Sequence, residues 1–220
     1  MRVAVLLSGG LDSLVAARLL AEQQQDVFGL HLHLGYNDLT AGEVARLAAA
    51  GGVPVTVRDC RRAFQSRIID YFTEAYLRGE TPNPCLWCNP CIKFGLGWEY
   101  ARQMGAEKIA SGHYCRLEGD GEKRRLLQGR DKEKEQSYFL ALLPRTCLAT
   151  VCFPVGHLTK TEVLQLARKK GLRPAAAKES QDICFIPAGT SCSAFIAGQG
   201  RQLPPAGRIE DMQGNILGEH

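Results

Sequence analysis

Short apolar runs alternate with longer helical patterns along the first half of the chain. The runs read as buried strands, and the stretches between them carry apolar side chains at helical spacing. In order, the segments are 2–7, 11–24, 27–33, 41–50, 53–57 and 60–77. Such alternation predicts an α/β fold in which a doubly wound parallel sheet is covered by helices on both faces.

The second half is predicted to begin with a loop over 79–88. After it, the pattern predicts a helix over 91–104, a buried strand over 108–111 and a hairpin whose arms flank residues 118–121. The charged stretch 130–135 has no apolar period, which indicates an exposed loop. A further helix is expected over 159–170, with Leu164 and Ala167 facing inward and Gly171 ending it.

The C-terminal residues have a different pattern. Pro204 and Pro205 indicate a linker, and residues 207–220 predict a β-hairpin around a turn at 213–215. Because a lone hairpin is marginally stable in water, we expect it to begin a small β domain. The chain is therefore predicted to contain one main domain over 1–200 and, over 201–220, a linker with the first hairpin of an incomplete β domain.

Composition narrows the class of protein. With 220 residues, of which 45% are hydrophobic and 23% charged, the chain can bury a substantial core. No run of about 18 uncharged apolar residues occurs, and no cleavage region follows the first apolar run, so neither a membrane span nor a secretory segment is expected. We therefore expect a cytoplasmic protein without a membrane partner. The net charge of +4 permits a polyanionic partner but does not by itself indicate one.

A glycine turn follows the first predicted strand. Ser8, Gly9 and Gly10 lie between that strand and a helix whose first turn carries Asp12 and Ser13. Glycines let the backbone wrap closely around an anion, and the helix dipole favours negative charge there. The turn therefore predicts a phosphate site with Asp12 as a Mg²⁺ ligand, although an ordinary strand-to-helix turn is the alternative. The lysine of G-x-x-x-x-G-K-[ST] is absent, so Walker-type chemistry is not expected.

Three of the nine cysteines are clustered. Cys85, Cys88 and Cys91 have C-x2-C-x2-C spacing. Asn89 is suited to a helix N-cap and Pro90 to the first helical position, so Cys88 and Cys91 are expected to flank a helix N-terminus. Thiolates are stabilised at such a position.

Cys184 is a fourth candidate thiol, in a stretch without a clear helical period. Together with the clustered three, it fits a catalytic pair, a tetrathiolate zinc site, or a [4Fe-4S] cluster with three or four protein ligands. The other cysteines are interpreted as small buried hydrophobes. They are Cys60, Cys115, Cys147, Cys152 and Cys192.

Two motifs resemble known families. Residues 8–13, Ser-Gly-Gly-Leu-Asp-Ser, resemble the S-G-G-x-D-S signature of the PP-loop ATP pyrophosphatases, which cleave ATP between the α and β phosphates and adenylate an oxygen. Residues 81–94 resemble the T-P-N-P-D-x-x-C-N-x-x-I-K-F stretch of the tRNA 2-thiouridylases, and segments 110–114, 136–140, 153–156 and 183–186 follow in that family's order. The chain thus resembles the N-terminal catalytic part of that family, with additional cysteines.

The resemblance implies an ATP-dependent tRNA sulfurtransferase. In that family ATP activates O2 of the wobble uridine, and sulfur delivered as a cysteine persulfide replaces the adenylated oxygen to give 2-thiouridine. By this resemblance Cys184 is the persulfide carrier and Cys88 the nucleophile that helps release sulfur. The residues expected to contact ATP are Leu6, Leu7, Ser8, Gly9, Gly10, Leu11, Asp12, Ser13, Leu32 and Gly112. Those expected near tRNA are Asn83, Pro84, Cys85, His113, Lys134, Glu135 and Gln136.

Two departures from the family pattern leave alternatives open. Cys85 and Cys91 stand where the family has acidic residues, so a carboxylate proposed for proton transfer is missing. Acid–base catalysis could move to His113 or water, or Cys85, Cys88 and Cys91, or two of them with Cys184, could hold an iron–sulfur cluster whose open iron binds sulfide. The segment 35–50 is also expected to be shorter than the corresponding segment of the family. The chain is expected to stop before the β-barrel that helps that family bind tRNA.

These departures define two rival hypotheses. The first is an iron–sulfur-dependent PP-loop enzyme that handles sulfur but acts on another RNA position or on a small molecule. The second is a truncated ATP- or tRNA-binding module in which Cys85, Cys88 and Cys91 hold structural zinc. In the leading hypothesis the partners are tRNA and either a sulfur-donor protein or sulfide.

Overall fold

A five-stranded parallel sheet forms the centre of the protein in the computed structural model, which describes residues 1–36, 38–174 and 183–219. The strand order is β3-β2-β1-β4-β7, with β1 in the middle and Val3 paired with Val27 on one side and Lys108 on the other. The strands are β1 (Arg2–Leu6), β2 (Asp26–His33), β3 (Val55–Asp59), β4 (Lys108–Ala110) and β7 (Val151–Cys152). The predicted doubly wound α/β fold is confirmed.

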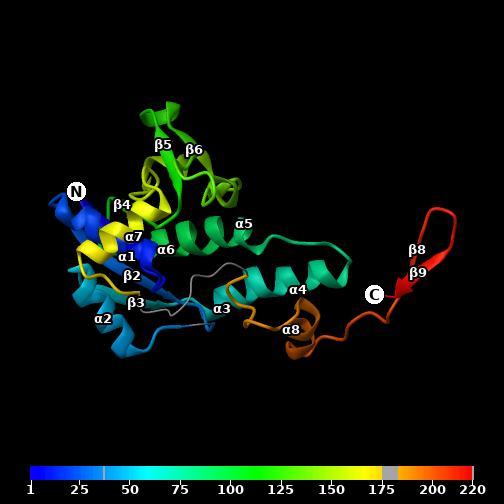
Figure 1. The fold of residues 1–220 in the computed structure, drawn as a ribbon. Helices are drawn as coiled ribbons and strands as arrows, with labels where there is room; N and C mark the ends of the chain where they lie inside the picture. Colours follow the sequence, from blue (N-terminus) through cyan, green and yellow to red (C-terminus); the bar gives the residue numbers. More distant parts are fainter. Residues whose placement is uncertain (37, 175–182, 220) are drawn as a thin grey trace.

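Helices cover both faces of this sheet (Figure 1). Because side chains alternate along a strand, Val3 and Val5 of β1 face one layer while Ala4 and Leu6 face the other. The first layer contains α1 (Leu11–Glu22), α2 (Ala41–Gly51) and α7 (Lys160–Lys169), and the second contains α6 (Gly97–Gln103). Central strands buried on both faces are apolar throughout, which explains the continuous run in β1.

A helical hairpin extends from the carboxyl edge of the sheet (Figure 1). Its first arm is a continuous helix made of α3 (Arg61–Phe64), the π-helical η1 (Gln65–Ile69) and α4 (Asp70–Leu77). Its second arm contains α5 (Pro84–Cys88) and the π-helical η2 (Asn89–Leu96) and continues into α6. The arms pack through a third apolar cluster that also includes Phe185 and α8 (Cys192–Gly198), a helix that the sequence did not predict.

The start of the second arm corrects the predicted cap. The helix begins at Pro84 and is capped by Asn83, whose Oδ1 accepts a hydrogen bond from the Cys85 amide at 3.1 Å. The predicted loop is therefore confirmed for 79–83 but wrong for 84–88, and the predicted cap at Asn89 and Pro90 is wrong. Asn83-Pro84 and Asn89-Pro90 carry the same capping signal, and the first pair is the one used.

Pro90 is accommodated inside the helix because the turn around it widens. An internal proline cannot donate the hydrogen bond of an α-helix, and its ring clashes with the carbonyl four residues earlier. The wider π-helix uses i→i+5 hydrogen bonds and so does not need that bond. Gly95 allows this geometry, since a Cβ there would lie 2.5 Å from the Pro90 carbonyl oxygen. Cys88 and Cys91 therefore lie inside a continuous helix and do not flank its N-terminus, whereas Cys85 lies in its first turn.

The remaining elements agree largely with expectation. The predicted hairpins are β5 (Cys115–Glu118) with β6 (Arg125–Gln128), and β8 (Arg208–Glu210) with β9 (Ile216–Glu219). The elements η3 (Gly121–Lys123), η4 (Ser137–Leu140) and η5 (Arg145–Ala149) are short 3-10 helices. In α7 the inward residues are Val163 and Ala167, whereas Leu164 is 37% exposed, contrary to expectation. The division at residue 200 stays a prediction, and across the described ranges no helix is long and apolar enough to cross a bilayer.

Candidate phosphate and thiol site

The glycine turn after β1 forms an open cradle at the start of α1. Gly9 has a φ of +88°, and a Cβ there would lie 2.9 Å from the Leu39 side chain, so the position requires glycine. Gly10 caps α1 without a side-chain hydrogen bond, while Ser13 Oγ donates to its carbonyl at 2.9 Å. The amides at the helix start are therefore not capped by a side chain, which suits an anion.

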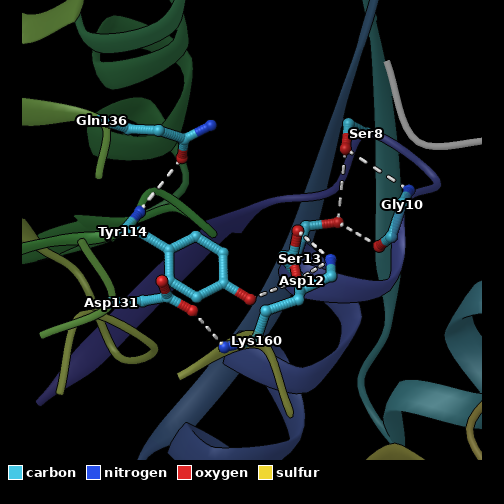
Figure 2. Close-up of polar contacts among 8 residues, drawn as sticks. All are labelled: Ser8, Gly10, Asp12, Ser13, Tyr114, Asp131, Gln136 and Lys160. Carbon is cyan, nitrogen blue, oxygen red and sulfur yellow. Dashed lines mark hydrogen bonds and ion pairs between the residues drawn. The ribbon is translucent and has the colours of Figure 1, made fainter. Parts of the chain in front are cut away.

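Asp12 is the centre of a polar group at this cradle (Figure 2). Lys160 Nζ lies 2.8 Å from Oδ1 and 2.9 Å from Oδ2, and Tyr114 Oη donates to Oδ1 at 2.8 Å. The side chains of Lys160 and Asp12 are 17% and 22% exposed, so the ion pair is largely shielded from solvent. The structure thus supplies a cation that the glycine motif itself lacks.

Lys160 is a site residue that the sequence reasoning missed. It is the first residue of α7, and its amide donates to Asp131 Oδ2 at 2.7 Å. Asp131 also accepts from the amides of Glu133 and Lys134, which ties the 130–136 loop to the start of α7. Local pattern could predict this helix, but nothing in it signals a partner 148 residues earlier.

Other predicted ATP contacts surround the cradle in different ways. Gly112 packs on the first turn of α1, where a Cβ would lie 2.7 Å from the Ser13 amide nitrogen. Leu7 is buried, and its carbonyl accepts a hydrogen bond from His31 Nδ1 at 2.8 Å. Leu32 packs partly buried beside two apolar clusters at the end of β2. Leu7 and Gly112 therefore each have a structural role. Contact of Leu7, Leu32 and Gly112 with ATP stays a prediction.

The four predicted thiols gather around the second arm of the hairpin. Cys88 is 7% exposed inside the third apolar cluster, beside Phe185. Burial raises the pKa of its thiol to about 12; Lys93 opposes this shift, and the nearby thiols of Cys184, Cys85 and Cys91 add to it. These mutual effects require the thiols to lie near one another.

Cys184, the predicted persulfide carrier, and Cys85, predicted to lie near tRNA, share this environment. Cys184 follows the undescribed segment 175–182 and is exposed as a residue, yet burial raises the pKa of its thiol while Lys93 lowers it. Burial also raises the pKa of Cys85, again against the charge of Lys93. All nine cysteines are free thiols. Lys93 is thus the cation common to the group, and it was not singled out from the sequence.

The metal alternatives gain no support from this arrangement. Within 1–36, 38–174 and 183–219, no group of three or more His, Cys, Asp or Glu side chains is placed to hold a metal ion. Both carboxylate oxygens of Asp12, the predicted Mg²⁺ ligand, contact Lys160 Nζ. A [4Fe-4S] cluster, structural zinc and Mg²⁺ at Asp12 all stay predictions.

The residues predicted to lie near tRNA are fixed by polar contacts on the 110–140 side. His113 is buried with Nδ1 2.7 Å from Ser111 Oγ, and burial, with Lys93, lowers its pKa well below the usual range. The imidazole is therefore neutral at pH 7. Gln136 accepts from the Tyr114 amide at 3.1 Å, which links the 130–136 loop to the residue that contacts Asp12.

Asn89 has a role in this region that differs from the predicted cap. Its Nδ2 donates to the carbonyl of Cys85 at 3.0 Å and to the carbonyl of Phe139 at 2.9 Å. The side chain is buried, so it joins the thiol-bearing helix to η4. Asn89 therefore links two elements and does not cap the helix. Glu135 Oε1 accepts a hydrogen bond from the Ser137 amide at 2.6 Å, which holds the end of the 130–136 loop at the start of η4.

Comparisons with known proteins identify the family. A family model described as the tRNA methyl transferase HUP domain matches residues 1–188. The chain is 49% identical over 219 residues to the tRNA-specific 2-thiouridylase MnmA of Desulfosudis oleivorans, covering 99% of this chain and 61% of that protein. It is 45% identical to the MnmA of Syntrophomonas wolfei subsp. wolfei, covering 100% of this chain and 64% of that protein.

The chain therefore spans less than two thirds of the length of these curated relatives. A solved structure from Methanocaldococcus jannaschii DSM, described as a predicted subunit of tRNA methyltransferase, aligns with a TM-score of 0.47 at 17% identity over 76% of this chain and 74% of that one. That likeness carries no further weight. The match of the family model and the identity to the relatives establish the assignment: the chain belongs to the tRNA-specific 2-thiouridylase family.

Proposed function

We propose that this chain carries the ATP and sulfur chemistry of a tRNA sulfurtransferase that converts a wobble uridine to 2-thiouridine. One observation carries the proposal. The phosphate cradle follows β1, and the thiol cluster packs on Leu32, Leu34 and Tyr36 at the end of the neighbouring strand β2. In open parallel sheets, ligands bind at the carboxyl ends of the strands near the point where strand order reverses. Anion site and thiols therefore meet at one edge.

In the first step, O2 of the uridine attacks the α-phosphorus of ATP, and the bond to the β-phosphate oxygen breaks as pyrophosphate leaves. The cradle amides bind phosphate oxygens, and Lys160 supplies positive charge beside Asp12. Bound Mg²⁺ would supply further charge neutralisation to the phosphates. Tyr114 orients the Asp12 carboxylate by its hydrogen bond.

In the second step, the terminal sulfur of a persulfide on Cys184 attacks C2 of the adenylated uridine, and AMP leaves with the original oxygen. The Cys88 thiolate then attacks the Cys184 sulfur, which leaves 2-thiouridine and a Cys88–Cys184 disulfide. A dithiol reductant returns both thiols, and a sulfur-donor protein then transfers the outer sulfur of its own persulfide to Cys184. With sulfide as the source, sulfide instead attacks the Cys88–Cys184 disulfide at the Cys184 sulfur, which restores the Cys184 persulfide and releases the Cys88 thiolate. The high pKa of buried Cys88 means that it must lose its proton in this step, and the charge of Lys93 favours that loss.

Nine free thiols suit a reducing compartment, which supports a cytoplasmic location.

The main test of the function is nucleoside analysis of tRNA after incubation with the protein, ATP, Mg²⁺ and a persulfide donor. The expected result is 2-thiouridine with the unchanged protein and none with Cys88→Ser or Cys184→Ser. Cys147→Ser, a partly buried thiol beside the second cluster, is the matched control and should retain activity. Product from the double variant lacking Cys88 and Cys184 would refute the assignment.

A further inference from the structure

A groove rich in arginine opens at the carboxyl end of β3, the edge strand of the sheet. Its volume is about 770 Å³. One wall is the start of the first hairpin arm, and the other is formed by Leu96 and Tyr100 of the second arm. The groove lies at the same edge of the sheet as the phosphate cradle, two strands away, or roughly 10 Å across the strands.

The charges in this groove are unequally neutralised. Arg61 forms an ion pair with Asp59 at 2.6 Å. Asp59 is the acidic residue among those that line the groove. Arg62 and Arg67 are exposed, and the described residues offer neither of them an ion pair or hydrogen bond. Arg58 lies behind them with its guanidinium 5.8 Å from the centre of the Tyr100 ring. The groove therefore has an excess of positive charge directed at solvent.

Arg58 adds a second observation. Its Nε is buried and has no hydrogen-bond partner in the described part of the chain. Because this atom is enclosed by protein and Arg58 lies outside the set of groove-lining residues, its guanidinium adds positive charge near the groove but does not line it. Because Arg58 already covers Tyr100, that ring is less available for stacking with a nucleic-acid base. The chemistry therefore favours a phosphate group over a base.

We propose that this arginine groove binds the phosphodiester backbone of the tRNA substrate. The inference rests on the proposed function and adds a contact surface to it. Arginine presents a planar fork of donors that matches phosphate oxygens, and such contacts fix the register of the nucleic acid without reading its sequence. A backbone held here would run along the carboxyl edge towards the cradle and the thiols.

The test is equilibrium tRNA binding by Arg62→Ala/Arg67→Ala across a series of salt concentrations. We expect affinity to fall roughly 10-fold or more, and the slope of log affinity against log salt to decrease by about 1 to 2, because two phosphate contacts are lost. ATP affinity should not change. The Arg62→Lys/Arg67→Lys variant, which keeps the charge, should retain most of the salt slope.

Arg46→Ala/Arg168→Ala is the matched control, since it removes the same charge from exposed positions on α2 and α7. An equal loss in this control, or unchanged tRNA affinity in the groove variant, overturns the groove as a tRNA site. Weaker ATP binding in the groove variant also overturns it and indicates a nucleotide site. If the unchanged protein binds tRNA through the groove but forms no 2-thiouridine, the proposed function fails while the groove stands.

Discussion

At the residue scale, the site depends on charged groups that sequence motifs do not connect. The glycine turn, Asp12 and the three clustered thiols could be predicted because their spacing is local, whereas Cys184 was assigned from the family resemblance. Lys160 was not, because its role depends on α7 folding back onto α1, and the same holds for Lys93, whose effect on the thiols appears only in the folded helix. Single-residue chemistry at this site is therefore completed by tertiary structure.

Replacing Lys160 with Met tests the cation at the cradle. Because hydrogen bonds to charged groups contribute about 1.5–3 kcal/mol, ATP affinity measured by calorimetry is expected to fall about 10- to 100-fold. Lys170→Met is the control, since Lys170 lies at the other end of α7 and pairs with Glu22 at 2.6 Å. Equal ATP affinity in the Lys160→Met protein and the unchanged protein would exclude Lys160 from phosphate binding.

The thiols are predicted to differ in reactivity because they differ in access. Alkylation requires the thiolate, and Cys88 has a pKa near 12, so little of it is ionised at pH 8. Iodoacetamide at pH 8, followed by peptide mass analysis, should label exposed Cys184 well before Cys88. Labelling of Cys88 should then accelerate as pH rises towards 12. Faster labelling of Cys88 at pH 8 would contradict the buried, protonated state.

At the element scale, helices and strands with a clear period were predicted well, and errors came from repeated signals. The two Asn-Pro pairs carry equal capping signals, and only tertiary packing decides that Asn83 caps while Asn89 is buried in the helix. The widened π turn around Pro90 has no recognised sequence pattern. Strand β7 has two residues and α8 seven, too few for a periodicity to be detected.

Two equivalent capping boxes allow a test of α7 as a positioning element. Thr40 with Glu43 caps α2, and Thr159 with Glu162 caps α7, each with reciprocal hydrogen bonds. Thr40→Ala and Thr159→Ala should each lower the free energy of unfolding by about 1 kcal/mol. ATP affinity should fall only for Thr159→Ala, because Lys160 is the next residue. Similar ATP affinities in both variants would show that the cap does not position Lys160.

At the scale of the whole molecule, the alternation of strands and helices predicted the doubly wound sheet, but not which loops would converge. Strand order brings the cradle after β1 beside the thiol cluster at the end of β2 and places the arginine groove after β3. Three regions distant in sequence thus share one carboxyl edge. A substrate that reaches all three regions would therefore bind along the carboxyl edge of the sheet.

The central claim is that one chain couples cleavage of ATP at the α-phosphate to sulfur insertion into tRNA. The most direct measurement is the ratio of nucleotide products to 2-thiouridine in one reaction containing ATP, tRNA and a persulfide donor. The account predicts one AMP and one pyrophosphate for each 2-thiouridine formed, and neither thiolated tRNA nor AMP accumulation when Asp12→Asn/Lys160→Met replaces the unchanged protein. Formation of ADP and phosphate, or of 2-thiouridine without ATP consumption, would contradict it.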